Sequence, residues 1–380
     1  MASSGRVALI HYWLLRMRGG ERVLEQVLRL FPDADIFTHV YDPAGVSELI
    51  RARPVRTTFI SRLPASRRLY QKYLPLMPLA LEELDLSGYD LVISFEAGPA
   101  KGVITGPDTL HVCYCHSPMR YLWDLYPQYK RSAGWLSRLA MPVFFPRLRT
   151  WDVASAARVD HFVANSDFIR RRIKKVYRRD ATVVHPPAPV ERFQPSAEVD
   201  RSYLWVGELA PYKRADIAVE AFTRLGLPLT VVGDGAMARS VRRGAGANIQ
   251  FITRLDFAGL REAYAKCRGL VFTAEEDFGI VPVEVMASGR PVLAYGAGGA
   301  LETVVPRVTG LFFGPQTADG LVEGIQRFEA WLPSFDPRDA IAHAARFSEA
   351  RFRSALLDAL ETAADDGPEA ARRMILAARA

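Results

Sequence analysis

Long hydrophobic runs are missing from this chain of 380 residues. A helix that crosses a bilayer needs roughly 20 consecutive apolar residues. The most apolar stretch, Leu136–Phe145, is short and is interrupted by Arg138 and Pro142, so we expect no membrane-spanning helix. Met1–Arg6 leads directly into a strand-like run, without the small-residue cleavage site of a secretory signal. We therefore expect the protein in the cytoplasm.

Cysteine is scarce, and the fingerprint of dinucleotide binding is absent. Three cysteines are too few for a disulfide framework, and we interpret Cys113, Cys115 and Cys267 as reduced thiols in the core. The stretch His11–Gly20 follows the first predicted strand and contains no Gly-x-Gly-x-x-Gly turn. This absence argues against a nicotinamide-dependent dehydrogenase.

What is present is an alternation of strand-like and helix-like segments, which predicts an α/β protein with helices on both faces of its parallel sheets. A length of 380 residues exceeds what one core supports and predicts two domains. The proline-rich segment His185–Pro195 can form neither helix nor central strand, and we interpret it as the linker. We predict domains over residues 1–190 and 196–345, with a C-terminal helix at about 350–380 as a candidate to pack back on the first domain.

The predicted strands fall into one series before the linker and one after it. The first series is Val7–His11, Asp35–Val40, Leu91–Phe95, Leu110–Cys115, His161–Ala164 and Thr182–His185, and the second is Tyr203–Gly207, Leu229–Gly233, Ile249–Ile252, Leu270–Thr273, Val292–Tyr295 and Gly310–Phe313. Ligands of such parallel sheets bind at the carboxyl ends of the strands, so the candidate residues are sought there.

The net charge of +7 is distributed unevenly. Basic residues are concentrated between Arg120 and Arg179, among aromatic and leucine side chains. A positive surface of this kind attracts polyanions. An anionic membrane leaflet fits the pattern as well as a nucleic acid does.

The strongest local pattern is Glu276-Asp-Phe-Gly-Ile-Val-Pro-Val-Glu284, which lies between two predicted strands. Gly279 lets the backbone approach a ligand. A helix is expected to begin near Ile280, and its free N–H groups form a site for a diphosphate. The carboxylates of Glu276 and Glu284 could hold separate hydroxyl groups of the same ligand by charge-assisted hydrogen bonds.

This pattern resembles the Glu-x7-Glu motif of retaining glycosyltransferases of family 4, and the resemblance extends over roughly residues 5–350. It implies the GT-B architecture, with two Rossmann-like doubly wound parallel-sheet domains and a cleft between them. The first domain would bind the acceptor and the second the nucleotide-sugar donor. Glu276 would bind the transferred sugar as a catalytic residue, and Glu284 would bind the ribose. Phe278, Gly279, Ile280 and Val281 would complete the donor site.

The segment Val206–Arg214 resembles the donor-phosphate loop of the same family, in which Lys213 would contact the diphosphate and act in catalysis. Many members carry arginine at the position of Glu208, so we assign the second cation to Arg214. Negative charge develops on the leaving diphosphate, and these cations with the helix start can stabilise it without a metal. Asp33-Ala-Asp35 precedes a strand instead of following one, and we expect no metal site and no cofactor.

Two features of the first domain extend the resemblance. Gly19 and Gly20 directly precede a predicted helix and resemble the glycine loop that closes over the donor phosphate. His116, within Tyr114–Asp124, follows a predicted strand at its carboxyl end. The resemblance implies that His116 is catalytic and lies close to the transferred sugar.

The segments around His116 and Glu284 are most similar to bacterial enzymes of polysaccharide and O-antigen assembly, often mannosyltransferases. This implies transfer of a hexose, with mannose from GDP-mannose as the first choice, to a glycan acceptor linked to polyprenyl diphosphate. The basic region would then rest on the inner face of the plasma membrane, and no nucleic acid partner is expected. Three alternatives stay open: a UDP-sugar-dependent glycosyltransferase, a GT-B nucleotide-sugar epimerase, and a non-catalytic sugar-binding protein.

Overall fold

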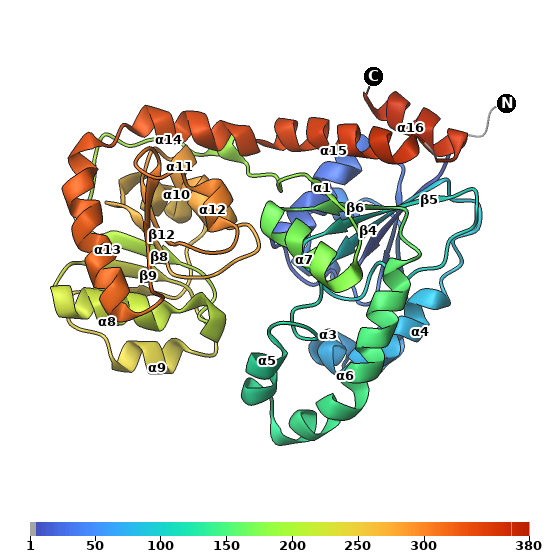
Figure 1. The fold of residues 1–380 in the computed structure, drawn as a ribbon, viewed down its shortest axis with the longest axis horizontal. Coiled ribbons are helices and arrows are strands. Elements are labelled where there is room, and N and C mark those ends of the chain that lie inside the picture. The colour runs from blue at the N-terminus through green and yellow to red at the C-terminus, as the bar shows by residue number, and fades with distance from the viewer. Residues whose placement is uncertain (1–4, 366, 380) are drawn as a thin grey trace. The chain divides into compact units, whose positions relative to one another are not determined.

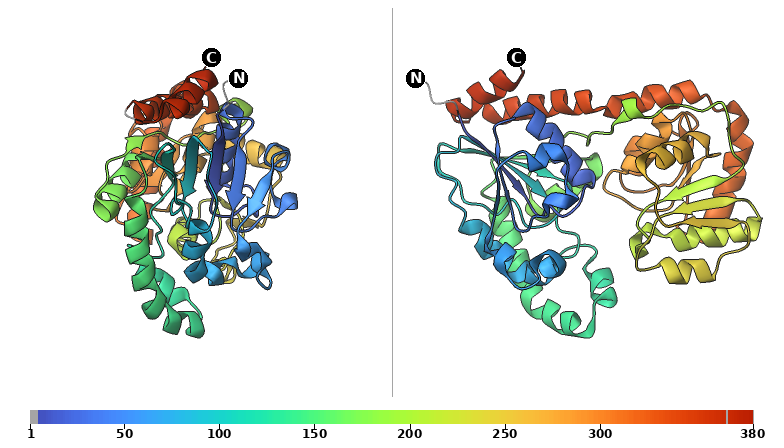
Figure 2. Two further views of the ribbon diagram at one scale, coloured as in Figure 1. Left: turned by 90° about the vertical axis from the view of Figure 1, so that its right-hand side faces the viewer. Right: turned by 180° about the vertical axis from the view of Figure 1, so that it is seen from behind.

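The structure is a computed structural model that describes residues 5–365 and 367–379. The chain forms two compact units (Figures 1 and 2). The first unit runs to Pro187 and resumes at Phe352, and the second unit comprises Ala188–Arg351. Each unit contains one parallel sheet, as the sequence predicts.

The first unit is built on a seven-stranded sheet with the order β3-β2-β1-β4-β5-β6-β7. Its central strands β1, β4 and β5 are buried along their whole length, which explains why they consist of continuous apolar runs. The strands are β1 Val7–His11, β2 Asp35–Thr38, β3 Val55–Thr57, β4 Leu91–Glu96, β5 Leu110–Cys115, β6 His161–Ala164 and β7 Thr182–Val183.

Helices cover both faces of this sheet. One face packs on α1, α15 and α16, and the other packs on helices that include α6 and α7. The α-helices are α1 Gly19–Leu30, α2 Glu48–Arg51, α3 Ser66–Leu69, α4 Met77–Glu82, α5 Tyr126–Ser132, α6 Trp135–Ala156, α7 Asp167–Tyr177, α15 Glu349–Ala364 and α16 Glu369–Arg379. The 3-10 helices are η1 Pro43–Gly45, η2 Phe59–Arg62 and η3 Tyr70–Leu76.

The second unit has a six-stranded sheet with the order β10-β9-β8-β11-β12-β13. Successive residues of its strands face opposite sides: Leu270 and Phe272 pack toward α10, α11 and α12, while Val271 packs toward α8 and α13. The strands are β8 Tyr203–Val206, β9 Leu229–Val232, β10 Ile249–Ile252, β11 Leu270–Phe272, β12 Val292–Tyr295 and β13 Gly310–Phe313. The helices are η4 Val190–Arg192, η5 Pro211–Lys213, α8 Ala215–Leu225, α9 Ala238–Arg243, α10 Phe257–Lys266, α11 Ile280–Ala287, α12 Ala300–Thr303, α13 Ala318–Trp331, η6 Leu332–Ser334, α14 Pro337–Ala344 and η7 Ala345–Phe347.

The chain returns to the first unit through α15. Phe352, Leu356 and Leu360 on this helix are buried in the same cluster as β1, β4 and β5. Helix α16 continues the cover with Ala371 and Ile375. The C-terminal segment is therefore part of the core of the first unit.

The expectations about the cysteines and about membrane-spanning helices can be compared with the structure. Cys113, Cys115 and Cys267 are buried free thiols, as predicted. In the ranges that the structure describes, no helix combines the length and apolar character needed to cross a bilayer.

The packing of α15 predicts that two leucines contribute differently to the free energy of unfolding. Leu360 is fully buried, so Leu360→Ala should lower the free energy of unfolding by about 2–5 kcal/mol through lost burial and the cavity left behind. Leu376 on α16 is 50% exposed, and Leu376→Ala should change it by less than about 0.5 kcal/mol. Urea unfolding monitored by circular dichroism measures both, and equal effects would contradict the packing of α15.

Candidate functional site

The start of α11 is shaped by a glycine. Gly279 caps this helix with φ of +88°, in the left-handed region that glycine adopts without strain. A Cβ atom at Gly279 would also lie 3.2 Å from the ring of Phe272. The first N–H groups of a helix lack carbonyl partners within it, so α11 presents donors beside the turn that precedes it.

Two further glycines, Gly298 and Gly299, pack against that turn. A Cβ atom at Gly298 would lie 2.5 Å from the carbonyl oxygen of Glu276, and one at Gly299 would lie 2.3 Å from Cα of Phe278. The N–H of Gly299 donates to the carbonyl oxygen of Glu276 at 2.8 Å. The loop after β12 therefore packs backbone to backbone on the Glu276–Phe278 turn.

Lys213 and Glu276, both predicted as catalytic, form an ion pair within the second unit. Their side chains are only 18% and 19% exposed. The hydroxyl of Thr273, just after β11, donates to the carbonyl oxygen of Lys213 at 2.8 Å and accepts from the indole N–H of Trp205 at 3.0 Å. Thr273 thereby ties the Lys213 loop to the neighbouring strand end. The sequence prediction missed Thr273, although its place at a strand end was a signal.

The other predicted cation has a different partner. Arg214 lies at the start of α8 with φ of +54°, and its guanidinium pairs with the carboxylate of Asp216 at 3.0 Å. Glu208 is exposed in the loop after β8. The second-cation role of Arg214 therefore stays a prediction, and it would require the Asp216 pair to be shared or exchanged.

The remaining residues of the predicted donor site are mostly buried. Glu284 is buried within α11, where it accepts a hydrogen bond from the hydroxyl of Tyr264 at 3.1 Å. The Phe278 ring packs on Phe347 with centroids 5.4 Å apart, so only the backbone of Phe278 is placed to meet a ligand. Ile280 and Val281 pack against the same core.

The first unit gathers a separate group of polar side chains around Gly20. A Cβ atom at Gly20 would lie 2.7 Å from the hydroxyl of Tyr12 and 3.5 Å from Nε2 of both His11 and His116. A Cβ atom at Gly19 would meet nothing within 4 Å. Of the two predicted glycines, only Gly20 is therefore required sterically.

Both histidines of this group are neutral at physiological pH. Burial lowers the pKa of His116 to about 4. Burial and the neighbouring His116 lower the pKa of His11 to about 3. Among the described residues, neither Nε2 atom has a hydrogen-bond partner, and both are shielded from solvent. A neutral imidazole can donate or accept one hydrogen bond there, for example with a sugar hydroxyl.

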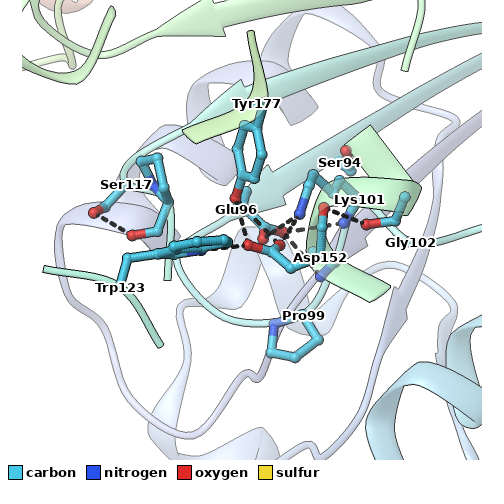
Figure 3. Close-up of polar contacts among 12 residues, drawn as sticks. Ser94, Glu96, Pro99, Lys101, Gly102, Ser117, Trp123, Asp152 and Tyr177 are labelled. Carbon is cyan, nitrogen blue, oxygen red and sulfur yellow. Dashed lines mark hydrogen bonds and ion pairs between the residues drawn. The ribbon is translucent and has the colours of Figure 1, made fainter. Parts of the chain in front are cut away.

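Beneath the His116 loop lies a fully buried charge cluster (Figure 3). The ammonium of Lys101 pairs with Glu96 at 3.1 Å and with Asp152. Asp152 also accepts from the indole N–H of Trp123 at 2.7 Å and from the hydroxyl of Tyr177 at 3.0 Å. The cluster thus connects the end of β4 with α6, α7 and the loop that follows His116.

The same cluster orients the His116 backbone. The N–H groups of His116 and Ser117 donate to the carbonyl oxygen of Glu96 at 2.8 and 3.1 Å. One Glu96 carboxylate oxygen accepts from the N–H groups of Ala100 and Lys101. Burial raises the pKa of Glu96, while the paired carboxylates raise that of Lys101 despite its burial.

Metal ligands are not grouped in this structure. Within residues 5–365 and 367–379, His, Cys, Asp and Glu side chains form no cluster of three that could hold a metal ion. The positive charge near the α11 start comes from Lys213.

Two family models match consecutive parts of the chain. The model described as "Glycosyltransferase Family 4" matches residues 17–192, and the model described as "Glycosyl transferases group 1" matches residues 189–345. Together they extend across both parallel-sheet units.

Curated relatives agree with these matches at low identity. The chain is 27% identical over 248 residues to a D-inositol 3-phosphate glycosyltransferase of Mycobacterium marinum, covering 57% of this chain and 53% of the relative. It is 29% identical over 197 residues to a GDP-mannose-dependent monoacylated alpha-(1-6)-phosphatidylinositol monomannoside mannosyltransferase of Corynebacterium glutamicum, covering 43% and 51%. It is 30% identical over 140 residues to O-antigen chain mannosyltransferase C of Escherichia coli, covering 35% and 37%. The chain thus matches about half the length of the first two relatives, and less of the third.

The fold is also similar to that of solved glycosyltransferase structures. A sucrose-phosphate synthase from Thermosynechococcus elongatus superimposes with a TM-score of 0.69 over 93% of this chain and 97% of its own, at 18% identity. The two parallel-sheet units define a protein of the GT-B class. With both family models matched in order, the chain belongs to glycosyltransferase family 4.

The glycine turn of the first unit generates a prediction about pH. Burial raises the pKa of Glu21 to about 7, while its carboxylate accepts from the N–H of Arg18 at 2.9 Å. The folded state favours the neutral acid, so the wild-type chain loses stability as pH rises from about 4.5 through 7. Glu21→Gln keeps the cap and removes the charge. Its free energy of unfolding should exceed that of the wild type by up to about 3 kcal/mol at pH 8.

Denaturant unfolding at pH 5 and pH 8 measures this difference. The advantage of Glu21→Gln should be small at pH 5, where the wild-type residue is protonated when folded. An advantage that is the same at both pH values would show that Glu21 does not titrate in this range.

The buried cluster generates a prediction about charge. Lys101→Met leaves two buried carboxylates without their cation, and removing one partner of a buried pair typically costs about 3–5 kcal/mol. Lys175, exposed on α7, is the matched control, and Lys175→Met should change stability by less than about 0.5 kcal/mol. Thermal unfolding at pH 7 compares them. A Lys101→Met chain as stable as the control would mean that the cluster does not stabilise the first unit.

Proposed function

We propose that this protein is a retaining, metal-independent glycosyltransferase that transfers a hexosyl group, most specifically mannose from GDP-mannose, to a glycan acceptor. The observation that carries the proposal is the ion pair of Lys213 with Glu276 beside the N-terminus of α11. Few arrangements bring together a cation, a carboxylate and the N-terminus of a helix. A sugar diphosphate needs all three, because its phosphates are anionic and its sugar carries hydroxyl groups.

In this proposal the donor contacts four groups of the second unit. The α11 N–H groups and the Lys213 ammonium bind the diphosphate. An ammonium has three donors, so Lys213 can contact a phosphate oxygen while it retains Glu276. The Glu276 carboxylate then accepts from hydroxyl groups of the transferred sugar. Glu284, oriented by Tyr264, accepts from the ribose.

The chemical step breaks the bond between the anomeric carbon and the β-phosphate oxygen, and its electron pair stays on the phosphate. Fixed positive potential from Lys213 and the helix start stabilises that charge. A new bond forms from the acceptor oxygen to the anomeric carbon on the same face. The proton of the acceptor hydroxyl passes to the departing phosphate oxygen. No side chain is required as a nucleophile, and no metal is required to balance the charge.

We assign acceptor binding to the first unit, where Gly20 brings His116, His11 and Tyr12 together. Their neutral imidazoles and hydroxyl suit an uncharged sugar. The choice of mannose and GDP rests on the relatives, two of which are named as mannosyltransferases. A polyprenyl-diphosphate-linked acceptor in cell-surface polysaccharide synthesis, met at the inner face of the plasma membrane, is the corresponding proposal for the partner.

Nucleotide binding tests the donor site directly. GDP at 100 times its dissociation constant should stabilise the protein by about 2.7 kcal/mol, measured as a thermal shift against UDP and ADP. Lys213→Ala should weaken GDP binding about 10- to 100-fold, since it removes a charge-assisted contact to phosphate. Glu276→Gln should leave GDP binding within about threefold but abolish mannosyl transfer, because in this proposal the sugar is the only part of the donor that Glu276 contacts.

Arg224→Ala is the matched control, because Arg224 forms exposed ion pairs elsewhere in the second unit. It should retain both binding and transfer. A larger shift with UDP would replace GDP-mannose by a UDP-sugar. No shift with any nucleoside diphosphate would reject the donor site.

A further inference from the structure

Helix α6 is apolar on two faces. Its inner face buries Met141 and Leu148 against the first unit. On the opposite side, four large apolar side chains are exposed: Trp135 by 71%, Leu136 by 65%, Leu139 by 69% and Val143 by 57%. Residues at these spacings share one side of a helix. We name this set the α6 outer face.

The charge around this face has one sign. Between Asp124 and Asp152 the chain carries no aspartate or glutamate, and it carries five basic residues: Lys130, Arg131, Arg138, Arg147 and Arg149. Arg138 and Arg147 are exposed on α6 itself. The outer face therefore combines apolar side chains with positive charge that no acidic residue of the same segment compensates.

The corner that presents the face is fixed by polar contacts. The guanidinium of Arg138 donates to the carbonyl oxygens of Arg131 and Ala133, at the end of α5, at 2.8 and 3.4 Å. The ammonium of Lys72 donates to the hydroxyl of Ser137 at 2.6 Å. Within the first unit, α5 and the start of α6 lie on the side away from α15 and α16 (Figures 1 and 2). The outer face is thus preformed.

We propose that the α6 outer face binds anionic bilayers, with Trp135, Leu136, Leu139 and Val143 inserted among the lipid headgroups and the basic residues on lipid phosphates. Tryptophan favours the membrane–water interface, and amphipathic helices with basic polar residues lie in that plane. The choice of a membrane as partner rests on the proposed lipid-linked acceptor. The face itself does not depend on catalysis.

A second copy of this chain fits the face less well. Pairing two outer faces would bring together the exposed Arg131, Arg138 and Arg147 of two copies, and like charges oppose that contact. Phosphate headgroups instead supply the missing negative charge, and juxtamembrane basic residues are attracted to anionic leaflets. Charge complementarity therefore selects the anionic bilayer.

Vesicle flotation tests the proposal with the full chain. The wild-type protein should float with vesicles containing phosphatidylglycerol and phosphatidylcholine in equal amounts, and should not float with pure phosphatidylcholine. Leu139→Ser should weaken binding about tenfold, because burying one leucine side chain accounts for a factor of that size. The control is Leu376→Ser, since Leu376 is 50% exposed on α16. This variant should bind the vesicles like the wild type.

Charge is tested in the same assay. Arg147→Glu should weaken binding to the anionic vesicles, whereas Arg243→Glu, an exposed position in the second unit, makes the same change in net charge and should have little effect. Equal loss in both variants would mean that only net charge attracts the vesicles, and would overturn the role of α6. The proposal also fails if the wild type does not float.

Two further measurements separate the alternatives. Mass photometry that shows a dimer lost on Leu139→Ser would assign the face to a second copy instead. Transfer to a water-soluble acceptor should be unchanged in Leu139→Ser. If vesicle binding persists while no variant or wild type transfers sugar, the proposed function fails and the membrane face stands.

Discussion

The Glu276–Phe278 turn is positioned by contacts between backbones, and the candidate donor site depends on them. Gly298 and Gly299 lie so close to this turn that any side chain would overlap it. Gly279 then starts α11 in a conformation that other residues adopt only with strain. A side chain at Gly298 or Gly299 would displace this turn, and with it the backbone that carries the Glu276 carboxylate toward Lys213. A charge pair of two flexible side chains is thus placed by rigid main chain.

Similar close packing lies under Lys213. A Cβ atom at Gly233 would lie 1.9 Å from the carbonyl oxygen of Gly207, and one at Gly235 would lie 2.7 Å from that of Leu209. The loops after β8 and β9 are therefore in backbone contact. Thr273 joins them to β11 through the carbonyl oxygen of Lys213. The strand-end loops of the second unit are thus connected to one another, so the groups of the proposed donor site would need little reorganisation to bind an anion.

The sequence predicted every strand of the two described sheets except β3, including the partly exposed edge strand β10. Central strands such as β1 and β5 were predicted with their observed bounds, because continuous burial requires continuous apolar sequence. β3 was missed because Val55–Thr57 is a three-residue edge strand with two exposed side chains. The meeting of Lys213 with Glu276 followed from the rule that ligands bind at strand ends. Gly298 could not be selected, because its role exists only in a contact between loops, whereas the strand-end position of Thr273 was a signal that the prediction did not use.

Buried charge was the least predictable feature. Lys101 stands in the sequence as an ordinary surface lysine, yet its side chain is completely buried between Glu96 and Asp152, whose positions in the chain are far apart. Local sequence carries no sign of such a cluster, because each member alone would be unfavourable inside a protein. The arrangement becomes favourable only when all its hydrogen bonds are made together. Glu96 also carries the carbonyl that orients His116, which gives the cluster a structural reason to lie where it does.

Helix α6 is another element whose burial could not be predicted from the sequence, because its apolar side chains are exposed. Large apolar side chains on a helix are expected to face the core, yet Trp135 and Leu139 are mostly exposed. Nothing in the packing of the first unit requires large apolar side chains at these positions, since Met141 and Leu148 on the inner face already make its contacts. Pro142 and Pro146 lie within the helix and would destabilise it in isolation. The proposed anionic bilayer would explain why large apolar side chains are exposed here, on a stretch that carries no acidic residue between Asp124 and Asp152.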